Sequence, residues 1–188
     1  MNNARNKDLS QLNFVEVRNY YSELRHVLYG QINETYPWFK CGPIGVQDVM
    51  QADAWRIQDD SPSRSEWRWS DAYSVYNRKS CFKRFDLCVK SGSNVAGLSY
   101  GLPTVSKSAL KIDIIEATPY TEHKKNTQIF EIISTAAQFY AILLGADEVR
   151  IMNPLSEQLS DYYCSFGYEY VEPRKKRFGV YCSMKVEV

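Results

Sequence analysis

The stretch that decides the fold is Phe82-Lys-Arg-Phe-Asp-Leu-Cys-Val-Lys90, followed by Ser91-Gly-Ser-Asn94 and the segment from Val95 to Thr104. Two apolar runs separated by a short polar turn predict a β-hairpin. A second turn leads into Leu110-Lys-Ile-Asp-Ile-Ile-Glu-Ala117, a third strand that Pro119 ends. Three consecutive strands joined by short turns predict an antiparallel meander.

Downstream of the meander, the apolar period changes from that of a strand to that of a helix. A polar loop at 121–126 precedes a helix from about Gln128 to Leu144, which is apolar over most of its circumference. Gly145 suits the C′ position of that helix. The short run 148–152 predicts a strand.

The last segment predicts one more helix and two closing strands. Asn153 can cap the helix with Pro154 at its first position, and the helix is expected to run to Gly167. Segments 168–171 and 178–186 predict strands around a basic turn at 174–177.

Upstream of the meander, helical signals dominate. Asn13-Phe-Val-Glu16 has the form of a capping box and predicts a helix up to Gly30. The segment 31–62 predicts mainly loop with a short helix through 46–54. Ser63-Arg-Ser-Glu66 is a second capping-box candidate, expected to open a helix toward Tyr76.

The order of elements predicts the fold class. Helices, three antiparallel strands and a β-α-β-α-β-β tail indicate an α/β (α+β) domain with a mixed, largely antiparallel sheet and helices on both faces. The N-terminal region is extended, helical and rich in Trp, because all four tryptophans precede residue 70.

Length and charge limit the class of protein. A chain of 188 residues with 44% hydrophobic content fits one compact domain with a real core. The formal net charge is +1, which makes a nucleic-acid-binding polycation unlikely. The charge is uneven: residues 1–75 sum to −2, 76–125 to +5 and 126–188 to −2. The basic centre is where an anionic ligand is expected, although a solvated Lys/Arg surface explains the charge equally well.

Cysteine usage and apolar runs indicate a cytoplasmic protein. The five cysteines are odd in number and lack C-x-x-C spacing, so reduced thiols are expected rather than disulfides or zinc. The first ten residues lack the apolar segment of a secretory signal. Polar residues interrupt the apolar run 129–144, which therefore predicts a buried helix and no membrane span.

Four segments of the C-terminal half resemble the GNAT superfamily of N-acetyltransferases. They are Val95-Ala-Gly-Leu98, Ile115-Glu-Ala-Thr-Pro119, Tyr140-Ala-Ile-Leu-Leu-Gly-Ala146 and Tyr163-Cys-Ser-Phe-Gly-Tyr168, the last similar to the family signature Y-x-x-x-G-F/Y. Their order and spacing carry the resemblance over about residues 80–188. It implies an acyl-CoA-dependent N-acyltransferase that moves an acyl group, typically acetyl from acetyl-CoA, to an amine by direct attack without a metal.

The resemblance also implies a cofactor site. In the family, the pantetheine arm pairs with the end of the third meander strand, which is splayed from the following strand, and the pyrophosphate lies at the start of the long helix. The residues so implied are Ile114, Ile115, Ala117, His123, Lys124, Lys125, Asn126, Thr127 and Asn153. The family's phosphate loop contains glycines, whereas Glu122-His-Lys-Lys-Asn-Thr127 contains none. Lys124 and Lys125 could supply positive charge instead.

Two catalytic residues follow from the same resemblance. Tyr163 is the candidate general acid at the leaving sulfur, and Glu116 is the candidate base, with Asp113 as a weaker substitute. Simpler roles compete: Tyr163 as a core residue with a satisfied hydroxyl, and Glu116 as a solvated carboxylate.

One domain is expected over 1–188, with 1–79 as a helical substrate-side region and 80–188 as the acyl-CoA-binding core. Aromatic and acidic residues in 1–79 suit an amine acceptor or a core between loops. Two other functions stay open. One is a catalytically inactive GNAT-like binding or regulatory protein, which the glycine-free loop favours. The other is a nucleic-acid-associated protein using 76–90 and 174–177, which the net charge disfavours.

Overall fold

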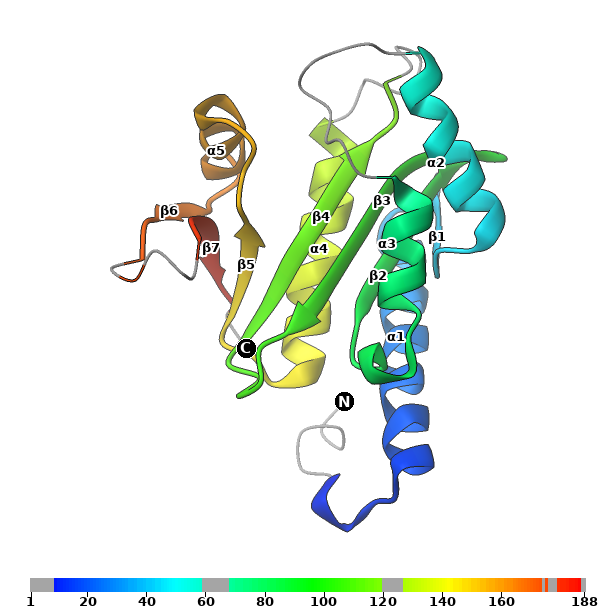
Figure 1. Cartoon of the computed structure of the whole chain (residues 1–188), viewed down its shortest axis with the longest axis vertical. Coiled ribbons are helices and arrows are strands. Elements are labelled where there is room, and N and C mark those ends of the chain that lie inside the picture. The colour runs from blue at the N-terminus through cyan, green and yellow to red at the C-terminus, as the bar shows by residue number, and fades with distance from the viewer. Residues whose placement is uncertain (1–8, 59–67, 120–126, 174, 176–178, 187–188) are drawn as a thin grey trace.

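The structure is a computed structural model that describes residues 9–58, 68–119, 127–173, 175 and 179–186 (Figure 1). In chain order the elements are the short 3₁₀ helix η1 (Leu9–Gln11), α1 (Phe14–Thr35), β1 (Lys40–Gly42), α2 (Val46–Gln58), α3 (Trp69–Tyr76), the 3₁₀ helix η2 (Lys79–Cys81), β2 (Phe85–Ser91), β3 (Asn94–Pro103), β4 (Ala109–Ala117), α4 (Thr127–Leu144), β5 (Glu148–Met152), α5 (Glu157–Cys164), β6 (Glu169–Val171) and β7 (Tyr181–Lys185).

One mixed sheet organises the described part of the chain. Its strands follow the order β1-β2-β3-β4-β5-β7-β6. Within this sheet β4 and β5 are parallel and the other neighbours are antiparallel. The predicted meander is β2-β3-β4, and the predicted fold class is confirmed.

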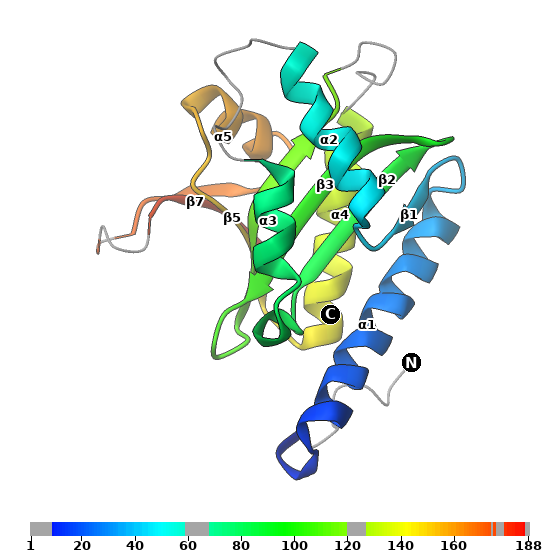
Figure 2. The same ribbon diagram turned by 45° about the vertical axis from the view of Figure 1, so that its right-hand side comes forward.

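Helices cover both faces of the sheet (Figures 1 and 2). On one face α1 and α4 pack over an apolar cluster that includes Leu28, Leu110 and Ile133. On the other face α2 and α3 pack over a second cluster that includes Trp55, Trp69 and Tyr100. Successive side chains along each strand point to opposite faces of the sheet and join opposite clusters, so each face has its own core.

The first helix begins where its capping box predicts. Asn13 Oδ1 accepts hydrogen bonds from the backbone N–H groups of Val15 (2.9 Å) and Glu16 (3.1 Å). The Glu16 carboxylate accepts from the Asn13 N–H at 2.8 Å, which completes the box. The helix continues past Gly30 to Thr35, because an exposed glycine in a helix costs only about 1 kcal/mol.

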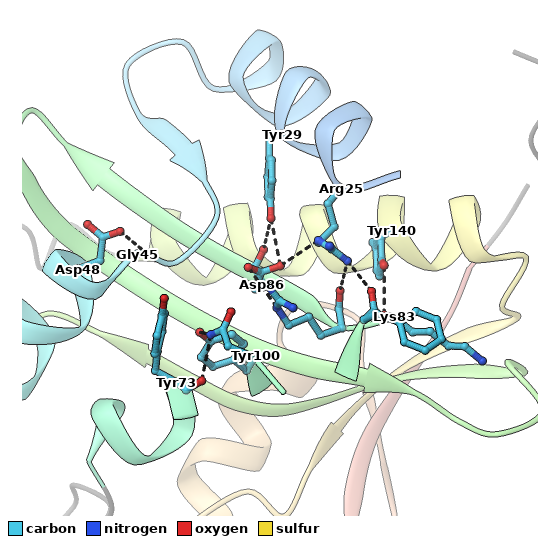
Figure 3. Close-up of polar contacts among 12 residues, drawn as sticks. Arg25, Tyr29, Gly45, Asp48, Tyr73, Lys83, Asp86, Tyr100 and Tyr140 are labelled. Carbon is cyan, nitrogen blue, oxygen red and sulfur yellow. Dashed lines mark hydrogen bonds and ion pairs between the residues drawn. The ribbon is translucent and has the colours of Figure 1, made fainter. Parts of the chain in front are cut away.

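A buried ionic network attaches α1 to β2 (Figure 3). Asp86 is 1% exposed, and its carboxylate lies 3.4 Å from Arg25 Nε and 3.6 Å from Arg84 Nε. The Tyr29 hydroxyl donates to Asp86 Oδ1 at 3.1 Å and to the Asp86 carbonyl at 3.2 Å. β1 pairs with β2 over Cys88–Lys90, and beyond that segment Tyr29 of α1 bonds to the Asp86 carbonyl of β2.

Boundaries upstream of the meander differ from the predictions. The segment 31–62 contains the end of α1, up to Thr35, and the strand β1 as well as α2. The helix that reaches Tyr76 begins at Trp69 after an extended Arg68. The capping-box candidate Ser63-Arg-Ser-Glu66 lies outside the described residues. The Asp53 carboxylate of α2 accepts from the Trp69 N–H at 2.7 Å and replaces a local cap.

Helix α5 also begins later than predicted. Its N-cap is Ser156, whose Oγ accepts from the Leu159 N–H at 3.2 Å. Asn153 is not an N-cap: its backbone is left-handed, with φ +47°, and its N–H donates to the Val180 carbonyl. Asn is one of the residues that tolerates this conformation.

A span across a membrane would need a long, apolar helix. No helix in the described ranges meets that requirement.

Candidate functional site

The two halves of β4 have different neighbours. Its paired half, Ala109–Ile112, bonds to β3 on one side and to β5 on the other, with the register ending at Ile112↔Ile151. Its open half, Asp113–Ala117, pairs with β3 alone among the described strands, and β5 diverges from it (Figure 1). A strand edge of this kind offers backbone N–H and C=O groups to an extended amide chain.

A β-bulge marks the start of the open half. Tyr100 pairs with Ile114 and Gly101 pairs with Ile112, so Asp113 is the extra residue. Bulges bend a strand and increase its twist, which accounts for the divergence at this point. A Cβ on Gly101 would lie 2.3 Å from the Lys111 carbonyl oxygen, so the bulge requires glycine there.

The first turn of α4 lies close to the open half. A Cβ on Gly97 would lie 2.4 Å from Ile129 Cγ2, and Gly97 pairs with Ala117. The missing side chain therefore lets the start of α4 approach the end of β4. A helix N-terminus presents unpaired N–H donors, as a phosphate requires. Thr127 begins α4, whereas His123, Lys124, Lys125 and Asn126 lie outside the described residues.

Two carboxylates of the open half are bonded to aromatic residues of α3. The indole Nε1–H of Trp69 donates to Glu116 Oε2 at 2.5 Å. The Tyr76 hydroxyl donates to Asp113 Oδ2 at 2.8 Å. Burial raises the pKa of the Asp113 carboxyl and outweighs the opposing effect of Tyr76. Glu116 is half-buried, and its carboxylate is hydrogen-bonded to the Trp69 indole.

Stacked rings hold the inner surface of α3 against the sheet. The Tyr76 and Tyr100 rings stack with centroids 4.6 Å apart at an interplanar angle of 5°, and the Trp69 and Tyr100 centroids are 5.9 Å apart. Asn77 Nδ2 donates to the Tyr100 hydroxyl at 3.3 Å. Burial raises the pKa of Tyr76 and of Tyr100, so both phenols are neutral; Tyr76 donates to Asp113, and Tyr100 accepts from Asn77.

Sequence reasoning missed Trp69 and Tyr76 as partners of these carboxylates. The available signal was their spacing, since residues seven apart lie on one face of a helix. The sequence did not show that the adjacent residues Asp113 and Ile114 share the face that α3 covers. The bulge places them on the same face of the sheet, whereas a regular strand would alternate them.

Tyr163 lies in the core of the other face. It is 6% exposed, and its ring stacks on Phe130 in the first turn of α4, with centroids 4.9 Å apart at 26°. Burial raises the pKa of its phenol. Tyr163 and Glu116 are thus contributed from opposite faces of the sheet, and the catalytic role of each stays a prediction.

The remaining residues predicted to bind the cofactor are divided between the two faces of the sheet. Ile114 packs against the α2–α3 cluster, and Ile115 and Ala117 pack against the α1–α4 cluster. Asn153 directly follows β5, the strand that diverges from the open half of β4.

All five cysteines are free. Burial raises the pKa of Cys41 to about 12 and of Cys182 to about 11. Within the part of the chain that the structure describes, no group of three or more His, Cys, Asp or Glu side chains could hold a metal ion.

Solved N-acetyltransferases share this fold. An acetyltransferase of the GNAT family from Staphylococcus aureus Mu50 matches with a TM-score of 0.60 at 8% identity, covering 79% of this chain and 99% of that one. An aminoglycoside 6′-N-acetyltransferase complexed with coenzyme A matches with a TM-score of 0.58 at 9% identity, covering 79% and 97%. The ribosomal-protein-S18-alanine N-acetyltransferase from Escherichia coli matches with a TM-score of 0.55 at 9% identity, covering 80% and 95%.

Comparison by sequence gives a different result. No protein-family model matches the chain, and no curated protein matches it. At such low identities the structural matches establish the architecture, which is that of the GNAT acetyltransferases.

Proposed function

We propose that this protein is an acyl-CoA-dependent N-acyltransferase, with acetyl-CoA as the expected donor and a primary amine as the acceptor. The observation that carries the proposal is the open half of β4, which leaves its edge available where β5 diverges. The shared fold with acetyltransferases, including one complexed with coenzyme A, supports the same activity.

The open half would hold the donor through backbone hydrogen bonds. Ile114, Ile115 and Ala117 provide the strand edge for the amides of the pantetheine arm, and Asn153 lies across from them at the end of β5. The pyrophosphate is assigned to the start of α4, with Lys124 and Lys125 as the source of charge.

The bound thioester supplies an activated acyl carbon, and the chain supplies proton transfer. Glu116, on the α3 face, accepts the proton that the acceptor ammonium must lose before its nitrogen forms the C–N bond. Tyr163, on the α4 face, donates a proton to the sulfur as the C–S bond breaks, and the second proton that the nitrogen loses on becoming an amide restores the phenol through water. Its raised pKa keeps the phenol protonated, as an acid requires.

The acceptor side is assigned to residues 1–79, and the donor side to residues 80–188 of the same domain. Helices α2 and α3 lie over the face that presents Glu116. Neighbours of this fold include enzymes named for aminoglycosides and for a ribosomal-protein alanine, so the amine here is defined only by class.

Calorimetric titration with acetyl-CoA and with free CoA tests donor binding. Binding of both at sub-millimolar concentration is expected, and absence of binding by either overturns the proposal. Replacing Lys124 and Lys125 together with Ala should weaken binding about tenfold through loss of phosphate contacts. The matched control replaces exposed Arg78 and Lys79 with Ala, which removes the same charge elsewhere and should leave affinity unchanged.

Thiol release against a panel of amines tests the chemistry. Tyr163→Phe should keep the affinity for acetyl-CoA and lose about 10²-fold in turnover, as expected for loss of a general acid. Tyr162→Phe, at the neighbouring position, should retain turnover. Unchanged turnover in Tyr163→Phe would remove this residue from the mechanism.

A second function is favoured by the glycine-free segment 122–127. The protein would then be a catalytically inactive GNAT-like binding or regulatory protein. Binding of CoA without thiol release across the amine panel would identify it.

A further inference from the structure

We propose that Trp69 is a positioning residue that fixes the Glu116 carboxylate and keeps it ionised, and that Asp53 in turn fixes Trp69. The proposal rests on the proposed function, in which Glu116 is the proton acceptor. Trp69 touches neither reactant and acts through Glu116.

The first link is the indole itself. Trp69 is 0% exposed, so its ring has a single packed position against Tyr100. Its Nε1–H donates to Glu116 Oε2 at 2.5 Å. A buried indole N–H needs an acceptor, and a carboxylate is the strongest that a protein offers. The carboxylate is therefore held in place by a rigid group.

The second link fixes the start of α3. Arg68 occupies the N-cap position without a side-chain capping bond. The Asp53 carboxylate from α2 fills that role, accepting from the N–H of Trp69 at 2.7 Å and of Ser70 at 3.3 Å. A negative charge at a helix N-terminus is favourable, so Asp53 anchors the residue that carries the indole.

The consequence for chemistry concerns protonation. A hydrogen bond donated to a carboxylate stabilises its charged form and disfavours its protonated form. Glu116 should therefore stay ionised, and able to accept a proton, at a lower pH than it would without Trp69. The same hydrogen bond also orients the Glu116 carboxylate, because the indole fixes the position of one of its oxygens.

Other titratable groups share this face among the described residues. They are Asp113 of β4, Tyr100 of β3, Tyr73 and Tyr76 of α3, Asp53 of α2, Cys88 of β2 and the ion pair between Asp48 of α2 and Lys90 of β2. Asp113 is the competing carboxyl near the reaction, so Asp113→Asn is included in the test.

The first experiment is the pH profile of kcat/KM for thiol release with the best acceptor of the amine panel. Trp69→Phe keeps an aromatic ring at this position and removes the donor. Its acidic limb should move to higher pH, with kcat at neutral pH reduced about tenfold and KM for acetyl-CoA unchanged. Tyr76→Phe is the matched control: it removes a donor to Asp113 from the same helix and should leave the limb in place.

Combination with Glu116→Gln separates positioning from packing. Glu116→Gln should abolish the limb, and Trp69→Phe added to it should cause no further loss. The limb should persist in Asp113→Asn. An unchanged limb in Trp69→Phe, or equal shifts in Trp69→Phe and Tyr76→Phe, would overturn the proposal.

A second measurement needs neither donor nor acceptor. The chain has four tryptophans, so the ¹⁵N spectrum holds four indole signals, and Trp69→Phe identifies one. That signal should shift as pH falls below about 4.3, when the Glu116 carboxyl takes up its proton, and should stop titrating in Glu116→Gln. A signal that ignores pH overturns the link between the two residues. Because the free protein is used, this result stands even if acetyl-CoA does not bind and the proposed function fails.

Discussion

The paired and open halves of β4 are bonded in different ways. In the paired half, Leu110 and Ile112 are 0% and 1% exposed and pack with Val149 and Ile151 of β5. In the open half every residue is half-buried, and two carboxylates are held by donors from α3.

This contrast shows what replaces pairing where a strand separates from its neighbour. Apolar packing and ladder hydrogen bonds stabilise the paired half. From the bulge residue Asp113 onward, β5 no longer pairs with β4, and side chains of α3 donate hydrogen bonds to the carboxylates of the strand. The open half is therefore less deeply buried than the paired half and has ordered polar groups, beside an edge with which no other described strand pairs.

The largest predicted difference comes from truncating one isoleucine in each half. Ile112→Ala should lower the free energy of unfolding by about 2–5 kcal/mol, because it leaves a cavity in a closed core. Ile114→Ala should cost about 1–2 kcal/mol, since its side chain is already partly exposed. Urea unfolding measures both. Equal costs would contradict the different packing of the two halves.

Gly101→Ala tests the β-bulge that separates the paired half of β4 from its open half. The added Cβ collides with the Lys111 carbonyl, so the free energy of unfolding should fall by about 1–3 kcal/mol. The control is Gly30→Ala in α1, where nothing lies within 4 Å of the new Cβ, and stability should rise by about 0.5–1 kcal/mol. A neutral Gly101→Ala would mean that the bulge does not depend on this glycine.

The smallest effects are opposite pH dependences at the two ends of the β4–β5 pair. Burial raises the pKa of Asp113, so the folded state holds this proton to a higher pH than the unfolded state does. Its contribution to stability should fall as pH rises above about 4, and Asp113→Asn should remove that fall. Burial would also raise the pKa of Glu148, but hydrogen bonds from Arg150 and Ser183 outweigh it and lower the pKa.

The contribution of Glu148 therefore has the other sign. It should be present above about pH 4.3 and disappear as pH falls further, and Glu148→Gln should remove it. Urea unfolding of both variants and the wild type, from about pH 3.5 to about pH 7, measures the two slopes. Slopes of the same sign would contradict the assignment.

The elements with regular periods could be predicted from the sequence. The meander, α4, the strand Glu148–Met152 and the capping box at Asn13 follow from local pattern, because each buries one face or satisfies its own end. The splaying of β4 from β5 was expected only from the family resemblance, and the register bears it out.

The polar part of the site could not be predicted, because its partners are distant in sequence. Asp53 caps a helix sixteen residues later, and Trp69 bonds to a carboxylate forty-seven residues later. The bulge at Asp113 changes which side chains share a face, and a strict two-residue period cannot reveal that. Asn153 and Ser156 are both good caps by type, and tertiary contacts decide between them.

Amide hydrogen exchange with and without CoA tests the central claim that the open half of β4 is the donor-binding edge. Saturating CoA should slow exchange in the segment 114–117 and at the start of α4, while exchange in the paired half, 109–112, stays unchanged as an internal reference. Slower exchange confined to other parts of the chain, or no change in 114–117 at saturation, would contradict the claim.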